Sequence, residues 1–226
     1  MSREQTITVA RGLPADHHRR VAELYYDAFQ QKFAPIFRTK AKSIAVLERS
    51  LNSAQAVVAL RGDELLGVAG FQCAGRSFLT FAFPTFRQVF GWLPGAIKYL
   101  SFGLFARPQR PGELLMDGIV VHPAARGQGV GTLLLHALFD IAQQQQMRTV
   151  RLDVVDTNPA ARRLYERLGF VAVKSRRYPL LRTIFGFSAS TTMIAQVNRL
   201  SAYRQPVYSP QPKQLLVTRQ FEGIGQ

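Results

Sequence analysis

The hydrophobic and polar positions of the chain follow two different periods. Apolar runs of four to nine residues predict strands, whereas apolar residues that recur every three or four positions predict helices. Strands are predicted at 6–9, 56–61, 65–72, 114–122, 150–155, 170–174 and 191–197. Helices are predicted at 16–32, 40–51, 129–145 and 158–168. A strand, a long helix, a strand and a helix in succession, with antiparallel strands around them, predict a mixed α/β sheet.

The segment 77–112 breaks this alternation and is rich in aromatic and basic residues. Its aromatic residues include Phe78, Phe81, Phe83, Phe86, Phe90, Trp92, Tyr99, Phe102 and Phe105. Residues 89–106 are apolar enough to raise the question of a membrane span, but Pro94, Gly95 and Lys98 argue against one. A helical lid or pocket wall is expected here, and a packing surface, a homodimer surface or a peripheral contact with a membrane are the alternatives.

Composition and charge narrow the class of partner. The chain has 226 residues and a formal net charge of +15, which indicates an anionic partner such as nucleic acid, a phosphate-bearing cofactor or a membrane surface. A genome-wide bias towards arginine explains the charge equally well. The basic residues form no dense block, which argues against nucleic acid as the main ligand. With one cysteine, Cys73, and four histidines without ligand spacing, neither a disulfide framework nor a metal site is expected. The N-terminal residues lack the apolar core of a secretory signal, so a cytoplasmic location is expected.

A glycine-rich turn joins the predicted strand 114–122 to the predicted helix 129–145. It reads Arg126-Gly127-Gln128-Gly129-Val130-Gly131. Glycines let the backbone approach a ligand closely, and the free N–H groups and dipole at a helix start suit phosphate oxygens. The turn lacks the lysine of a P-loop and the full dinucleotide-binding pattern. Three glycines that ease a tight strand-to-helix turn explain it equally well.

A second segment follows one helix and one strand later. It runs from Asn158 to Phe170 and reads Asn-Pro-Ala-Ala-Arg-Arg-Leu-Tyr-Glu-Arg-Leu-Gly-Phe. Asn158 has the form of a helix N-cap before a proline, and Gly169 that of a helix C-cap. Tyr165 falls at helical spacing among apolar residues, so a core position also explains it. These readings explain each residue separately but not the order of the two segments.

Together the two segments resemble the signatures of the GNAT superfamily of acyl-CoA-dependent N-acyltransferases. The turn fits the pattern Arg/Gln-x-x-Gly-x-Gly/Ala, and the second segment fits Asn-x-x-Ala-x-x-Leu-Tyr-x-x-x-Gly-Phe. The resemblance covers 113–170 by motif and the flanking elements by order. It implies the GNAT fold, an α/β fold whose mixed, mostly antiparallel sheet has splayed central parallel strands flanked by helices. The domain is expected at 1–198, with the insertion 77–112 and a C-terminal tail at 199–226.

The resemblance also implies the reaction and the cofactor. Acyl-CoA, most simply acetyl-CoA, is expected as co-substrate, and an amine is expected to attack it directly. The residues expected to bind the cofactor are Ile119, Val120, Val121, Arg126, Gly127, Gln128, Gly129, Val130, Gly131 and Asn158. Gly118, inside the strand, would mark a bulge that splays the parallel strands and frees an N–H for the thioester carbonyl. A non-catalytic acyl-CoA-binding or membrane-associated module is the competing class.

The catalytic candidates are one tyrosine and three carboxylates. Tyr165 resembles the family's general acid, since a neutral phenol can protonate the departing thiolate. Asp153 is the first candidate for the general base, and Asp117 and Glu113 are the alternatives. Asp117 and Glu113 share a strand face if no bulge intervenes. Each carboxylate has a structural alternative, which is to balance a nearby arginine such as Arg151.

The acceptor or the transferred acyl chain is expected to have a sizeable apolar part, and the arginines near it would suit an anionic group on that partner. Two connections lie at the acceptor end of the fold implied by the resemblance, 77–112 and 176–187, and both mix aromatic residues with arginines. Aromatic side chains bury large apolar areas, so an apolar partner is expected to cover them. A polycationic amine would be repelled by a protein of charge +15.

Overall fold

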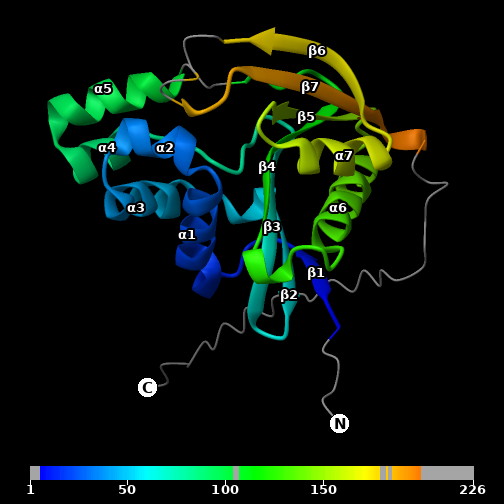
Figure 1. Cartoon of the computed structure of the whole chain (residues 1–226). Helices are drawn as coiled ribbons and strands as arrows, with labels where there is room; N and C mark the ends of the chain where they lie inside the picture. The colour runs from blue at the N-terminus through cyan, green and yellow to red at the C-terminus, as the bar shows by residue number, and fades with distance from the viewer. Residues whose placement is uncertain (1–5, 104–106, 179–181, 183–184, 200–226) are drawn as a thin grey trace, which may run out of the picture.

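Within residues 6–103, 107–178, 182 and 185–199, which this computed structural model describes, seven strands form one sheet (Figure 1). The sheet order is β1-β2-β3-β4-β5-β7-β6. The strands are β1 Thr8–Arg11, β2 Ala56–Arg61, β3 Glu64–Gln72, β4 Glu113–Val121, β5 Thr149–Val155, β6 Val171–Arg177 and β7 Ala189–Gln196. Neighbouring strands are antiparallel except β4 and β5, which are parallel. The predicted mixed, mostly antiparallel sheet is therefore confirmed.

Helices cover both faces of the sheet. They are α1 His18–Ala28, α2 Gln30–Phe37, α3 Lys40–Ser50, α4 Phe83–Phe90, α5 Trp92–Gly103, α6 Val130–Gln144 and α7 Pro159–Arg167. Single turns of 3₁₀ helix lie at Ala15–His17, Ser53–Gln55, Pro123–Ala125 and Val197–Arg199. In Figure 1, α6 and α7 lie on one side of the strands and α1 to α5 lie on the other. Each side encloses its own hydrophobic core.

The helix predicted at 16–32 is in fact two helices that extend further along the chain. The break falls at Phe29, whose backbone leaves the helical region, and α2 then continues to Phe37. Pro35 lies inside α2, where it removes one backbone donor and would normally end a helix. The burial of Phe33 and Phe37 in the core stabilises the helix across the proline.

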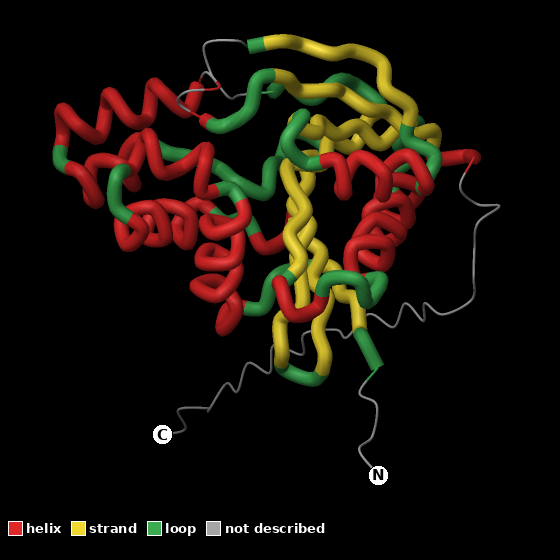
Figure 2. The backbone as a smooth tube through the Cα atoms, viewed as in Figure 1, coloured by secondary structure: helices red, strands yellow, loops and turns green. Residues whose placement is uncertain are grey.

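The two central parallel strands separate after a short contact. β4 and β5 pair only where Glu113–Leu115 faces Thr149–Arg151. On the other edge of β4, Gly70 faces Gly118 and Phe71 faces Met116, so Asp117 is the extra residue of a bulge. Figure 2 shows the result, in which β5, β7 and β6 are turned away from the strands β1 to β4. The bulge expected at Gly118 is confirmed, one residue earlier than its glycine.

The insertion 77–112 is helical, and its inner side is part of the protein's own core. The ring of Phe102 in α5 lies 5.1 Å from that of Phe37 in α2 and 4.5 Å from that of Phe81, measured between centroids. Phe78 and Phe86 are fully buried. The expectation that an outside partner covers the aromatic residues is therefore wrong for most of them, because α1, α2 and α3 cover them instead.

The outer side of α5 is different. Its most exposed apolar side chains are those of Trp92, Leu93, Ile97 and Leu100. In the described part of the chain, no helix has both the length and the apolar character needed to cross a membrane. The tail predicted at 199–226 lies outside the described residues beyond Arg199, as do 179–181 and 183–184 of the acceptor-side connection.

Candidate active site

The glycine-rich turn presents the start of α6 to open space. Gly127 and Gly129 have φ angles of 78° and 79°, a region that favours glycine, and among the described residues no atom outside the adjoining ones comes within 4 Å of where a Cβ would lie on either. Gly129 is the N-cap of α6, and no side chain in the described part of the chain caps this helix. The first N–H groups of α6 are thus free for an anion, with the favourable end of the helix dipole behind them.

The side chains of the turn divide between shaping it and facing solvent. Gln128 donates a hydrogen bond of 2.9 Å to the Ala124 carbonyl and accepts one of 2.6 Å from Arg61. Arg126 is exposed. Val130 is buried under the turn, and Gly131 lets α6 approach α7 closely, since a Cβ there would lie 3.2 Å from Leu164. The turn is therefore held rigid from beneath while its main chain faces outward.

The next stretch of β4 borders the gap left by the splayed strands. Ile119 and Val121 pack against the core on the α6 side, whereas Val120 is buried on the α1 side. Towards β3 these residues are paired, but towards β5 the described strand pairing stops at Leu115. The main-chain groups on that edge are available to an extended ligand.

Asn158 is the N-cap of α7, and Tyr165 lies within this helix, whose Leu164 approaches Gly131 at the start of α6. Asn158 caps the helix by accepting a hydrogen bond of 3.1 Å from the Ala161 N–H, and it is exposed. The Tyr165 ring is buried, 5.8 Å from the ring of Phe170 between centroids. Burial raises the pKa of Tyr165 above its ordinary value, so the phenol keeps its proton. Tyr165 thus has the packing of a core residue and the protonation state that an acid requires.

A second tyrosine, Tyr25 of α1, reaches the gap from the opposite face of the sheet. Its hydroxyl oxygen occupies the space where a Cβ at position 118 would lie, so only glycine fits at Gly118. Burial raises the pKa of Tyr25, with a further contribution from Asp117 and a smaller one from Tyr165. The sequence places Tyr25 only on a buried helix face. The glycine inside β4 signals a close approach but does not identify what approaches.

A pocket of about 880 Å³ lies on this same face of the sheet. Its aromatic wall comes from α1, α2 and the insertion, and includes Tyr25, Phe29, Phe33, Phe81 and Phe102. Its charged floor comes from β4 and β5, through Asp117, Arg151 and Asp153. The insertion therefore forms part of the pocket wall as well as part of the core.

Arg107 of the insertion binds two of the candidate bases at once. It donates a hydrogen bond of 3.0 Å to Asp153 and lies 3.6 Å from the Asp117 carboxylate. It also donates to the Asp117 main-chain carbonyl, at 3.2 Å. Asp117 further accepts from Gln72 at 2.5 Å, and Asp153 accepts from Thr192 at 2.6 Å. The structure thus brings Asp117 and Asp153 together around one guanidinium.

The two carboxylates have opposite pKa shifts. Burial raises the pKa of Asp117 above its ordinary value, and the charge of Arg107 and the hydrogen bond from Gln72 offset this only in part. Burial also acts to raise the pKa of Asp153, but the hydrogen bonds from Thr192 and Arg107 outweigh it, so the pKa is lowered. Asp117 is therefore the stronger base of the two.

Glu113 is held apart from this pair. Both of its carboxylate oxygens lie 3.0 Å from Arg151 Nε, and one lies 2.7 Å from Arg151 Nη2. The Arg110 N–H donates to the same carboxylate at 2.8 Å. Glu113 and Arg151 are both buried. This geometry matches the structural alternative for Glu113, a buried ion pair whose acceptor positions are occupied.

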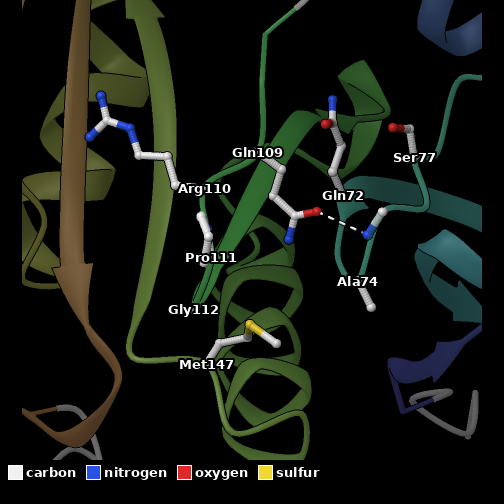
Figure 3. Close-up of a pocket in the computed structure, with 9 residues that line it drawn as sticks. Gln72, Ala74, Ser77, Gln109, Arg110, Pro111, Gly112 and Met147 are labelled. Atoms are coloured by element: carbon white, nitrogen blue, oxygen red, sulfur yellow. Dashed lines mark hydrogen bonds between the residues drawn. The ribbon is translucent and has the colours of Figure 1, made fainter.

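A shallower hollow of about 490 Å³ adjoins the pocket and shares Gln72, Ser77 and Arg110 with it (Figure 3). Gln109 crosses this hollow, accepting a hydrogen bond of 3.2 Å from the Gly75 N–H and donating one of 2.7 Å to the Glu113 carbonyl. In Figure 3 the Arg110 side chain points away from Gln72 and Ser77. The segment from Gln109 to Arg110 thus ties the end of the insertion to β3 and β4.

Comparison with known proteins gives a consistent family and fold. The sequence matches the Acetyltransferase (GNAT) family over residues 19–170, which is more than half of the chain. An N-acetyltransferase from Staphylococcus aureus is similar in structure, with a TM-score of 0.59 at 15% identity over 83% of this chain and 100% of that one. The Salmonella typhimurium protein yncA, solved with its cofactor acetyl-CoA, has a TM-score of 0.53 at 19% identity, over 91% and 98%. A third acetyltransferase has a TM-score of 0.55 at 20% identity, over 84% and 98%.

Proposed function

Because the chain belongs to the GNAT family of acetyltransferases, we propose that it is an N-acyltransferase that transfers acetyl from acetyl-CoA to an amine by direct attack. One observation carries this proposal above the others. The separation of β4 from β5 is accompanied by an open helix start and, at the bulge of β4, by the Asp117 carboxylate of raised pKa and the protonated Tyr25 phenol, while a second protonated phenol, Tyr165, is near enough to contribute to the raised pKa of Tyr25. That set can bind a phosphorylated acyl donor and move the two protons of the reaction.

The cofactor is proposed to lie along the edge of β4. The pyrophosphate would bind the N–H groups of the turn from Arg126 to Gly131, and pantetheine would run beside Ile119 to Val121. Asn158, the N-cap of α7, is proposed to border this path. The solved structure of yncA with its cofactor acetyl-CoA supports acetyl-CoA as the donor. A main-chain N–H at the Asp117 bulge would stabilise the oxyanion that forms on the thioester carbonyl.

Asp117 is proposed as the general base. An alkyl ammonium must lose a proton before its nitrogen can attack, and Asp117 combines a raised pKa with a position on the bulge itself. Asp153, first among the candidates from sequence, is better suited to hold Arg107 and Thr192. Glu113 is proposed to be structural, because Arg151 already occupies its oxygens.

The proton balance then closes with Tyr165. The ammonium first gives one proton to Asp117, directly or through water, and the neutral nitrogen then forms a bond to the carbonyl carbon. As the carbon–sulfur bond breaks, the sulfur takes the proton of the Tyr165 hydroxyl, which burial keeps protonated before the step. The second proton that the nitrogen loses on forming the amide restores the Tyr165 hydroxyl through water, and Asp117 releases its proton to solvent. The products are an amide and free CoA.

A cytoplasmic location stays a prediction from the sequence.

The test is thiol release by the full chain with a panel of acyl-CoAs and amines. We expect release with acetyl-CoA that depends on the amine and yields the amide by mass spectrometry. Asp117→Asn should lower the rate, whereas the matched variant Asp63→Asn, in the exposed β2–β3 hairpin, should not. Binding of acetyl-CoA without thiol release from any amine would instead support a non-catalytic acyl-CoA-binding module.

A further inference from the structure

The pocket of about 880 Å³, in which the amine acceptor is proposed to bind, carries an excess of positive charge. Among its described lining residues, the cations are Lys32, Arg107, Arg110, Arg151, Lys174 and Arg176, against the two carboxylates Asp117 and Asp153. Two of these cations are paired within the protein, because Arg107 binds both aspartates and Arg151 binds Glu113. Arg110, Lys174 and Arg176 are exposed at the rim. Among the described lining residues, Lys32 is thus the only cation that is neither paired within the protein nor exposed.

Lys32 faces the pocket from α2 without an anionic partner. Its ammonium group lies 5.5 Å from the centroid of the Phe29 ring, and among the described residues it makes no hydrogen bond or ion pair. Its pKa is lowered to about 8, mainly by burial and to a smaller extent by the charge of Arg107, while Asp153 opposes both. A cation in such surroundings is destabilised unless a ligand supplies a negative charge.

The surroundings of Lys32 define the rest of the ligand. Phe29, between α1 and α2, and Phe33 of α2 line the same pocket, and Phe81 and Phe102 of the insertion continue its wall. An acceptor that places its amine at Asp117 therefore meets a cation and an apolar surface in the same pocket. A polycation satisfies neither of these two features.

Building on the proposed transfer to an amine, we infer that the acceptor is an amphipathic amine that carries an oxyanion, a carboxylate or a phosphate, which pairs with Lys32 while its apolar body packs on the aromatic wall. The amine end then lies towards Asp117 and Asp153. This acceptor class explains why the pocket keeps an unpaired lysine beside phenylalanine rings. It also refines the partner expected from the sequence, because it places the negative charge of an apolar acceptor beside Lys32.

The test measures binding with probes that have no amine, so it does not depend on acyl transfer. Phenylacetate, phenylphosphonate and the neutral phenylacetamide are titrated into the full chain by calorimetry. Wild type should bind an anionic probe at least about tenfold more tightly than the amide, because a charge-assisted contact is lost with the neutral one. The preferred anion distinguishes a carboxylate site from a phosphate site.

Variants locate the site. Lys32→Gln should weaken anion binding about tenfold or more and leave amide binding unchanged, and Lys32→Arg should retain preference for the anion. Lys42→Gln, the same change on α3 at a lysine outside the pocket lining, should behave as wild type. Equal binding of the anionic probes and the amide, an unchanged Lys32→Gln variant or no binding of either anion would overturn the inference. None of these outcomes bears on thiol release, so the two proposals fail separately.

Discussion

The Tyr25 hydroxyl occupies the space beside Gly118 where any other residue would place its Cβ atom. The contact joins α1 to the bulged part of β4, and the Phe29 ring lies beside the same position, 2.9 Å from that Cβ site. Gly118 is thus required by the side chains that pack against it and not by its backbone angle. The same contact also fixes the Tyr25 phenol at the point where β4 and β5 separate.

Gly118→Ala should therefore destabilise the fold. The added methyl group would clash with a buried tyrosine and a phenylalanine that have little room to move, an overpacking effect of about 1–3 kcal/mol. The measurement is the free energy of unfolding in urea. Tyr25→Phe removes the clashing oxygen, so the double variant should recover part of the loss. Additive losses in the double variant would show that the Tyr25 contact is not the cause.

Much of the fold could be predicted from the sequence because strand and helix periods are local. The strand 56–61 and the cap at Asn158 depend on residues next to them in the chain, and both are confirmed. The extension of α2 across Pro35 could not be predicted, since its stability comes from Phe33 and Phe37 packing against distant α5 and α4.

The candidate site also has a part that the sequence predicts and a part that it does not. The glycine-rich turn is contiguous in the sequence, so its motif predicts it. The meeting of Arg107 with Asp117 and Asp153 depends on how the insertion folds back over two strands, and neither spacing nor composition indicates it. The same holds for Lys32, which the sequence shows only as one more basic residue at the end of a predicted helix.

Gly129→Val should abolish stabilisation by acetyl-CoA. Valine both strains a backbone with φ of 79° and places a side chain where phosphate oxygens are proposed to bind. Wild type should gain about 2.7 kcal/mol at a cofactor concentration one hundred times Kd, seen as a rise in Tm. Gly91→Val is the matched control, because Gly91 has a similar φ of 85° and lies between α4 and α5. A normal rise in Tm for Gly129→Val would contradict the placement of the pyrophosphate.

Tyr165→Phe should reduce kcat by roughly 10²- to 10⁴-fold with little effect on acetyl-CoA binding, as expected for a positioned acid. The ring stays in place against Phe170, so the fold should be retained. Thiol release gives the rate, and calorimetry gives the binding. An unchanged kcat would assign Tyr165 to the core alone and direct attention to Tyr25 as the donor.

Replacing the candidate carboxylates one at a time should change the pH dependence of kcat/KM in different ways. Asp117 must be deprotonated to act as a base, so kcat/KM should fall as the pH drops through its raised pKa. Asp117→Asn should remove this acid limb and recover partly at high pH, where more of the amine is already neutral. Asp153→Asn should lower the rate but keep the limb. An acid limb that persists in Asp117→Asn would assign the base elsewhere.

Glu113→Gln should instead lower the free energy of unfolding by about 3–5 kcal/mol, because it leaves Arg151 buried without its partner.

The outer face of α5 should bind an anionic membrane surface. Trp92 and Leu100 are 67% and 71% exposed, and Leu93 and Ile97 extend the same apolar face. A second copy of a chain with charge +15 would be repelled, whereas anionic lipid would be attracted, so lipid is the better cover. Trp92→Ser and Leu100→Ser should therefore reduce flotation with anionic liposomes and leave Tm nearly unchanged.

Phe102→Ser is unsuitable for this purpose, because that ring packs on Phe37 and its loss would disturb the core. Flotation with neutral liposomes alone would contradict the preference for anionic lipid. No flotation at all, together with dimerisation that is lost in the same two variants, would contradict the membrane assignment and identify α5 as an interface between copies.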